Sequence, residues 1–136
     1  MQFQASIVPK LGLLLSTILL LVTSFALSAS PAAAETYTVK MGSDNGRLKF
    51  VPRTLTIKPG DTIQWVMNKL GPHNVVFDKT PGNDADLAKS LSQEKLLFAS
   101  GESLETTFPA DAPSGTYSFY CHPHQGVRMK GKITVE

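Results

Sequence analysis

A segment near the end of the chain gathers side chains that can bind soft metal ions. Cys121, His122, His124 and Met129 supply a thiolate, two imidazoles and a thioether within a short stretch. Sulfur ligands combined with imidazole select copper, zinc or iron–sulfur chemistry rather than magnesium or calcium. Cys121 is the only cysteine of the chain, which is too few for an iron–sulfur cluster or for c-type haem attachment. The segment therefore predicts a copper or a zinc site.

A copper site for electron transfer usually takes two histidines and one cysteine, with a weak axial methionine. The chain has 3 histidines. His122 directly follows Cys121 at a strand end, where successive side chains point to opposite faces, so we expect it to face away from the metal. His124 can turn back towards Cys121, and His73 begins a separate strand. The predicted ligands are therefore His73, Cys121, His124 and Met129.

Each of these residues also has a structural explanation when it is taken alone. Cys121 could be an inert buried thiol, His73 a half-buried strand residue, His124 a surface residue and Met129 core filler. Together they favour a metal site, because the only cysteine and a matching set of soft ligands converge on one loop. Zinc is the alternative metal, although structural zinc sites prefer four strong ligands and rarely use methionine.

The elements that must position these residues are short β segments. Alternating apolar residues between turn signals predict strands over residues 37–41, 55–58, 62–67, 73–77, 104–108, 115–121 and 131–135. One short helix is predicted over residues 84–91, with Asp84 as its N-cap. About seven short strands in about a hundred residues indicate an all-β, Greek-key β-sandwich. Loops at one end of such a sandwich can draw residues from distant parts of the sequence.

The first 34 residues have the pattern of a secretory signal peptide. Lys10 precedes an apolar run over residues 11–22, and small residues follow as far as Ala34. We expect cleavage after Ala34, which leaves a domain over residues 35–136; an uncleaved membrane anchor is the alternative. The chain has 13 Lys and Arg, of which Lys10 lies in this leader, against 11 Asp and Glu. The near-neutral domain has no basic run, so nucleic-acid binding is not expected.

Two segments of the chain resemble the cupredoxins, and among them the plastocyanin family. The first is Gly-Pro-His-Asn-Val-Val-Phe-Asp over residues 71–78, and the second is Tyr-Cys-His-Pro-His-Gln-Gly-Val-Arg-Met over residues 120–129. Residues 42–46 and the stretch that follows also resemble the start of that family. The Cys-x-x-His-x-x-x-x-Met spacing is shared with pseudoazurins, so it does not decide between the families. The identity of the residues around the ligands favours the plastocyanin family.

The resemblance implies one type 1 copper ion per chain. His73 and His124 would be the nitrogen ligands, Cys121 the thiolate ligand and Met129 the axial ligand. It also implies that the backbone N–H of Asn74 donates to the Cys121 sulfur, a bond that orients a ligand and tunes its metal.

The resemblance further implies a monomeric electron carrier without substrate chemistry. Such proteins shuttle electrons from cytochrome f to photosystem I in the thylakoid lumen, docking transiently at membrane complexes. The leader fits an exported protein and has no chloroplast transit region, which favours a cyanobacterial-type precursor. Two alternatives are a cupredoxin that serves a periplasmic enzyme and a copper storage or delivery protein.

The expected partner surface surrounds the edge of His124. Electrons would leave through His124 or Tyr120, although Tyr120 could equally be an ordinary strand aromatic. Arg128 would steer acidic groups of the partner, because the chain shows no acidic patch. We expect the apolar part of this surface to be formed by Leu48, Gly71, Pro72, Pro123, Gln125 and Gly126.

Overall fold

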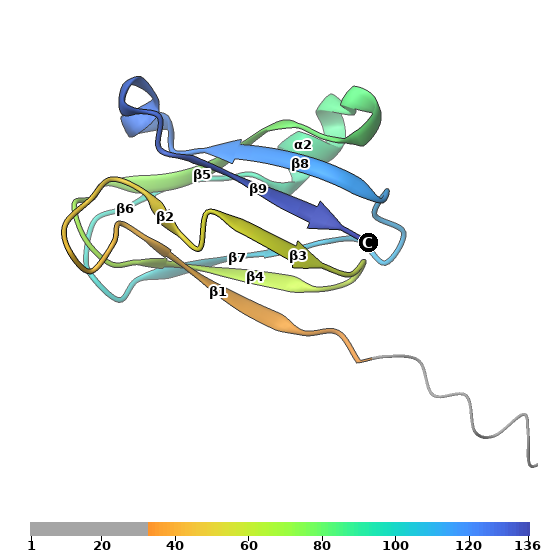
Figure 1. Ribbon diagram of the computed structural model, residues 1–136, viewed down its shortest axis with the longest axis horizontal. Coiled ribbons are helices and arrows are strands. Elements are labelled where there is room, and N and C mark those ends of the chain that lie inside the picture. The colour runs from red at the N-terminus through yellow and green to blue at the C-terminus, as the bar shows by residue number, and fades with distance from the viewer. Residues whose placement is uncertain (1–32) are drawn as a thin grey trace, which may run out of the picture. The chain divides into compact units, whose positions relative to one another are not determined.

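The computed structural model describes residues 33–136, which form a sandwich of two β-sheets (Figure 1). The four-stranded sheet has the order β2-β1-β4-β7 and contains β1 (Thr36–Met41), β2 (Phe50–Val51), β4 (Thr62–Met67) and β7 (Ser103–Thr107). The five-stranded sheet has the order β3-β9-β8-β5-β6 and contains β3 (Thr54–Ile57), β5 (His73–Lys79), β6 (Gln93–Leu97), β8 (Gly115–Tyr120) and β9 (Lys130–Val135). The predicted all-β sandwich is confirmed.

The helix and most of the strands follow the sequence pattern. Helix α2 covers Ala85–Leu91, and the side chain of Asp84 accepts hydrogen bonds from two backbone N–H groups of its first turn, as predicted. Two short 3₁₀ helices, η1 (Pro81–Asn83) and η2 (His122–Val127), complete the elements. The strands β2 and β6 were not predicted. β2 has only 2 residues, and β6 is an edge strand whose middle residues are exposed, so neither shows alternation.

Aromatic side chains fill the space between the two sheets. Trp65 and Phe50 come from the four-stranded sheet and Phe119 from the five-stranded sheet, and all three are buried. The Phe119 ring lies 4.8 Å from the Phe50 ring and 4.9 Å from the Trp65 ring, both edge to face, which is a favoured arrangement for aromatic pairs. The Trp65 indole N–H donates to the buried Thr106 hydroxyl, so its polar atom is satisfied. This core is a rigid base for the loops at its ends.

The strand directions bring two distant segments to one end of the sandwich. β8 runs antiparallel to both β5 and β9, so the end of β8 lies beside the beginnings of the other two strands. His73 is the first residue of β5, and η2 is the loop between β8 and β9 at the upper left of Figure 1. The topology therefore places His73 beside the loop of residues 121–129.

The leader predicted over residues 1–34 falls almost entirely outside the described residues, so its cleavage stays a prediction. Within residues 33–136, no helix has both the length and the apolar character that crossing a membrane requires.

Candidate metal centre

Three of the predicted ligands meet at the end of the five-stranded sheet. The ligand atoms of His73, Cys121 and His124 all lie within 4.8 Å of one another. The Cys121 Sγ is 3.6 Å from Nδ1 of His73 and 3.5 Å from Nδ1 of His124. One sulfur thus faces the same nitrogen of two imidazoles, although His73 is 48 residues away in the sequence. This donor set suits a soft or borderline metal ion.

The neighbours of His73 select one tautomer of its imidazole. Its Nε2 lies 2.6 Å from the backbone oxygen of Lys69. A carbonyl oxygen can only accept, so Nε2 must carry the proton and donate, which leaves a lone pair on Nδ1. His73 is fully buried, and burial is the main cause that lowers the pKa of its imidazole. The surroundings therefore favour the neutral imidazole, with its Nδ1 turned towards Cys121.

A glycine leaves room for the Lys69 carbonyl in this position. Gly42 has a φ of 86° and follows β1, and a Cβ added to it would collide with the Lys69 carbonyl oxygen. The loop that follows β1 is also bonded to the segment before His73. The side-chain amide of Asn68 donates to both Gly42 O and Asp44 Oδ1 at 2.9 Å. The segment before His73 is thus fixed against the end of the other sheet.

His124 is held differently, in the 3₁₀ turn η2. Its side chain is partly exposed, whereas His73 is not. Its backbone N–H donates to the Cys121 carbonyl at 3.2 Å, which turns the loop back over the sulfur. Burial lowers the pKa of its imidazole as well. The ring lies 5.0 Å from the His73 ring, measured between centroids.

The Cys121 thiol is fully buried at the base of this group. Burial raises its pKa, while the backbone N–H groups of Asn74 and His124 oppose that shift by favouring the thiolate. A bound cation would stabilise the thiolate further. The two imidazole nitrogens and this sulfur fit a metal ion, which binds the deprotonated form of the thiol.

Met129 is also fully buried next to this group. Its carbonyl accepts from the Cys121 N–H at 2.9 Å, and its own N–H donates to the His124 carbonyl at 3.3 Å. These backbone bonds close the loop of residues 121–129 on itself. The backbone bonds keep Met129 next to Cys121 and His124, and its role as the weak fourth ligand stays a prediction.

The side chain of Asn74 has a role that the sequence did not reveal. Its Oδ1 accepts from the His122 N–H at 2.8 Å, and its Nδ2 donates to the Glu94 carbonyl at 3.1 Å. The side chain is buried, so both bonds are shielded from water. Only the backbone N–H of Asn74 was singled out from the sequence, whereas its side chain ties the His73 strand to the ligand loop.

The histidine that we excluded from the site lies elsewhere. His122 is exposed, and its ligating atoms are not among the group formed by His73, Cys121 and His124. Its ring is 6.4 Å from the Tyr120 ring.

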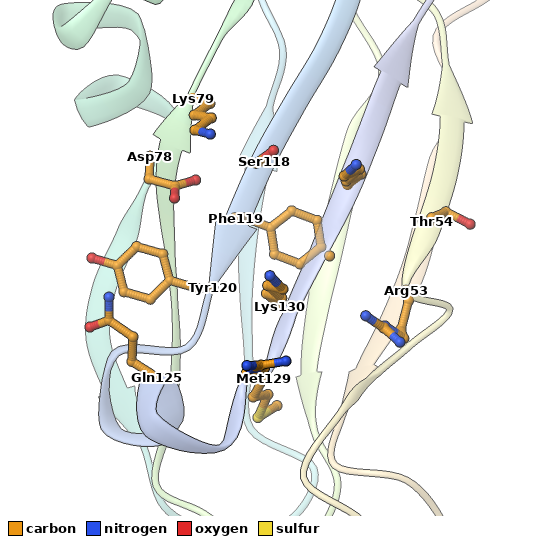
Figure 2. A pocket seen from close by; sticks show the side chains of 13 residues that line it. Arg53, Thr54, Asp78, Lys79, Ser118, Phe119, Tyr120, Gln125, Met129 and Lys130 are labelled. Carbon is orange, nitrogen blue, oxygen red and sulfur yellow. The ribbon is translucent and has the colours of Figure 1, made fainter.

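A groove with many cationic side chains lies beside the metal-binding residues, on the face of the five-stranded sheet (Figure 2). It has a volume of about 780 Å³, and Tyr120 and Met129 are among the residues that line it. Its five cations are Arg53, Lys79, Arg128, Lys130 and Lys132, against one acid, Asp78. The only ion pair among the described residues is Lys40–Asp44, so none of the five is paired with a carboxylate. We call these thirteen lining residues the cationic groove.

The sequence pointed to only part of this groove. Arg128 and Tyr120 were expected at the partner surface, and both line it. Arg53 and Lys132 were not expected, because they are far apart in the sequence and meet only through the parallel pairing of β3 with β9. Nothing in a local pattern predicts that pairing.

The exposure of the residues expected around His124 can be compared with the structure. Gly126 is exposed with open space around it, Pro72 is half-buried, and Leu48 is half-buried and packs against the core. Two further apolar residues of the segments that carry His73 and His124 are exposed, Leu70 at 49% and Val127 at 60%. Exposed apolar residues in the loops that carry the ligands could have been noticed in the sequence, because both lie within three residues of a predicted ligand.

Comparison with known proteins identifies a copper-binding family. The family model described as copper binding proteins, plastocyanin/azurin family, matches residues 37–136. A plastocyanin of Nostoc punctiforme is 59% identical over 129 residues, covering 93% of this chain and 93% of the relative. A plastocyanin of a Synechococcus strain is 51% identical over 130 residues, covering 96% of this chain and 95% of the relative.

A solved structure supports the same assignment. The oxidized form of plastocyanin from the fern Dryopteris crassirhizoma superposes with a TM-score of 0.62 at 32% sequence identity. The match covers 73% of this chain and 99% of the fern protein.

Proposed function

This chain belongs to the plastocyanin/azurin family of copper-binding proteins, and we propose that it carries single electrons from cytochrome f to photosystem I. The ion would be held by His73, Cys121, His124 and Met129, one ion per chain. Copper supplies the one-electron couple between Cu⁺ and Cu²⁺ when it is bound. The protein would act as a monomer in the thylakoid lumen and would transform no substrate.

The observation that carries this proposal is the convergence of one buried thiol on two imidazoles. The chain's own bonds hold these groups, because His73 is fixed by the Lys69 carbonyl and the ligand loop is closed by its own backbone bonds. An electron carrier benefits from a ligand set that does not rearrange, and a preformed site on a rigid scaffold meets that need.

Two residues are proposed to connect the site with a partner. His124 is the ligand with an exposed edge, and the open space around Gly126 lets another protein approach it closely. Tyr120 precedes Cys121 in the chain and lines the cationic groove. Partners would therefore meet either the apolar surface around His124 or the groove beside Tyr120.

The charge of the groove indicates which partner surface fits it. Five unpaired cations attract acidic groups, and they raise the rate of encounter without adding much to the final affinity. Arg128 belongs to the ligand loop and also lines the groove, so we propose that it steers an acidic surface of the donor or acceptor.

The optical spectrum of the copper-loaded protein tests the proposal. We expect an intense thiolate-to-copper absorption that bleaches on reduction and is absent in the Cys121→Ser variant. A colourless copper-loaded protein would refute the proposed site. It would also favour the alternative of a storage or delivery protein, which should bind mainly Cu⁺ and exchange it easily.

The proposed route needs a separate experiment with the partners. Rapid reduction of the oxidised protein by a soluble fragment of cytochrome f supports the route, as does rapid oxidation of the reduced protein by photosystem I. Reduction only by a periplasmic dehydrogenase would leave the copper site intact and overturn the route.

A further inference from the structure

A buried carboxylate lies at the start of the first strand, at the opposite end of the molecule from the ligands. Asp61 is 3% exposed and belongs to the turn between β3 and β4. Its Oδ2 accepts from the Lys58 N–H at 2.8 Å, which closes the turn. Its Oδ1 accepts from the backbone N–H of Glu35 at 2.9 Å, 26 residues earlier in the chain.

No cationic side chain of the described residues balances this carboxylate. Their only ion pair is Lys40–Asp44, so no charged nitrogen of a lysine, arginine or histidine side chain among them lies within 4.0 Å of the Asp61 carboxylate. The neighbourhood is negative, because the charges of Glu35 and Asp61 both act on Tyr37. The Glu35 carboxylate accepts from the Tyr37 hydroxyl at 2.8 Å. The hydrogen bond to Glu35, with smaller contributions from burial and from the charges of Glu35 and Asp61, raises the pKa of Tyr37. Buried charges are usually paired, which leaves Asp61 in need of a positive partner.

The backbone nitrogen that contacts Asp61 is the atom that signal-peptide cleavage would change. Hydrolysis of the Ala34–Glu35 peptide bond consumes one water, leaves a carboxylate on Ala34 and converts the Glu35 nitrogen into an ammonium group. That nitrogen already lies at hydrogen-bond distance from Oδ1. We propose that Asp61 is the binding site for the new N-terminal ammonium of the processed protein, an inference that rests on the predicted cleavage after Ala34.

The consequence is that processing anchors the first strand. The Glu35 carbonyl accepts from the Thr62 N–H at 2.9 Å, where the parallel pairing of β1 with β4 begins. β1 lies inside its sheet, between β2 and β4. A charge-assisted hydrogen bond is shorter and stronger than a neutral one, so the ammonium would fasten the strand more firmly than the amide does.

The first experiment compares two copper-loaded chains that differ by two N-terminal residues and therefore in the chemistry of this nitrogen. One begins at Glu35, and the other retains Ala33 and Ala34, so that position 35 keeps its amide. We expect the first to unfold at a temperature higher by on the order of 5 °C. Each chain is also made with Asp61→Asn, which keeps an oxygen acceptor for the turn but removes the charge, and there the difference should vanish. Equal unfolding temperatures of the two unsubstituted chains would overturn the proposal.

The second experiment follows the titration of the ammonium itself by NMR of a chain that begins at Glu35. Pairing with Asp61 should raise its pKa above the ordinary value of about 7.7 to 8.0. A raised pKa means that the stabilisation is complete below the unfolded value and is lost as the pH rises through the folded value. The Glu35 and Tyr37 side chains also face this group, so Glu35→Gln serves as the control and should leave most of the shift intact. An ordinary pKa in the unsubstituted chain would refute the pairing.

The N-terminal residue of the exported protein is determined first, by mass spectrometry. A start at Glu35 supports the proposal, and a start at another residue overturns it. Neither result bears on the copper site, because the absorption spectrum reports on the ligands at the other end of the sandwich.

Discussion

The two segments that supply the imidazoles are built in opposite ways. The segment before β5 buries His73 completely and holds its Nε2 with the Lys69 carbonyl. The loop of residues 121–129 leaves His124 partly exposed, and its turn is closed mainly by its own backbone bonds. One segment therefore supplies rigidity, and the other supplies access. An electron carrier needs both properties, since the ligands must stay in place while one of them comes close to a partner.

Removing each imidazole in turn should give the largest contrast between the two segments. The His124→Gly variant should regain its thiolate-to-copper absorption when free imidazole is added, because the vacated space opens to the surface. The His73→Gly variant should stay unrestored, because that ring is fully buried. The measurement is a titration with imidazole followed in the visible spectrum. Equal restoration of both variants would contradict the assignment of rigid and accessible roles.

Cutting the connection between the segments should have the next largest effect. The Asn74→Ala variant loses the two buried hydrogen bonds to His122 and Glu94, and we expect it to lower the free energy of unfolding by about 1–3 kcal/mol. Denaturant unfolding of the metal-free protein measures the loss. Gln125→Ala, at an exposed position of the same loop, is the matched control and should change stability little. A similar loss in both variants would mean that the Asn74 bridge contributes nothing specific.

Acid should affect the buried segment more than the exposed one. Burial lowers the pKa of both His73 and His124, so the fold favours neutral imidazoles. Their stabilisation is complete above the unfolded value of about 6.5 and is lost as the pH falls through the folded values.

We therefore expect the metal-free protein to be less stable at pH 5 than at pH 7. His73→Gln should reduce this pH dependence more than His124→Gln does, because His73 is the more buried. Denaturant unfolding of the metal-free variants at pH 5 and pH 7 measures the difference in the free energy of unfolding. If His124→Gln reduced the pH dependence of stability more than His73→Gln does, the prediction would be wrong.

Reversing one charge on the accessible loop should give the smallest effect. Arg128→Glu should slow electron transfer with an acidic partner about two- to tenfold at low salt, because it weakens electrostatic steering. The effect should fade at high salt, where exposed charges are screened. Stopped-flow kinetics over a range of ionic strength measures both. Lys58→Glu makes the same charge change at the other end of the sandwich and should leave the rate nearly unchanged; an equal slowing would show that net charge matters rather than the groove.

The sequence by itself determined the features that depend on a few neighbouring residues. The spacing of Cys121, His124 and Met129 predicts a closed loop of soft ligands, and the position of Asp84 predicts the cap of α2, which the structure confirms. Alternation predicts most of the strands. It also indicates that His122 points away from Cys121, because the side-chain directions of adjacent extended residues follow from local backbone geometry.

Only the tertiary structure decided which distant residues meet. The distance between the imidazole of His73 and the Cys121 sulfur, the Asn74 bridge and the contact between Asp61 and Glu35 all join residues at least 26 positions apart. The cationic groove likewise depends on the pairing of β3 with β9. Such contacts depend on sheet order and register, which result from the packing of the whole core. No local pattern contains that information, so candidate ligands could be named from the sequence while the residues that support and surround them could not.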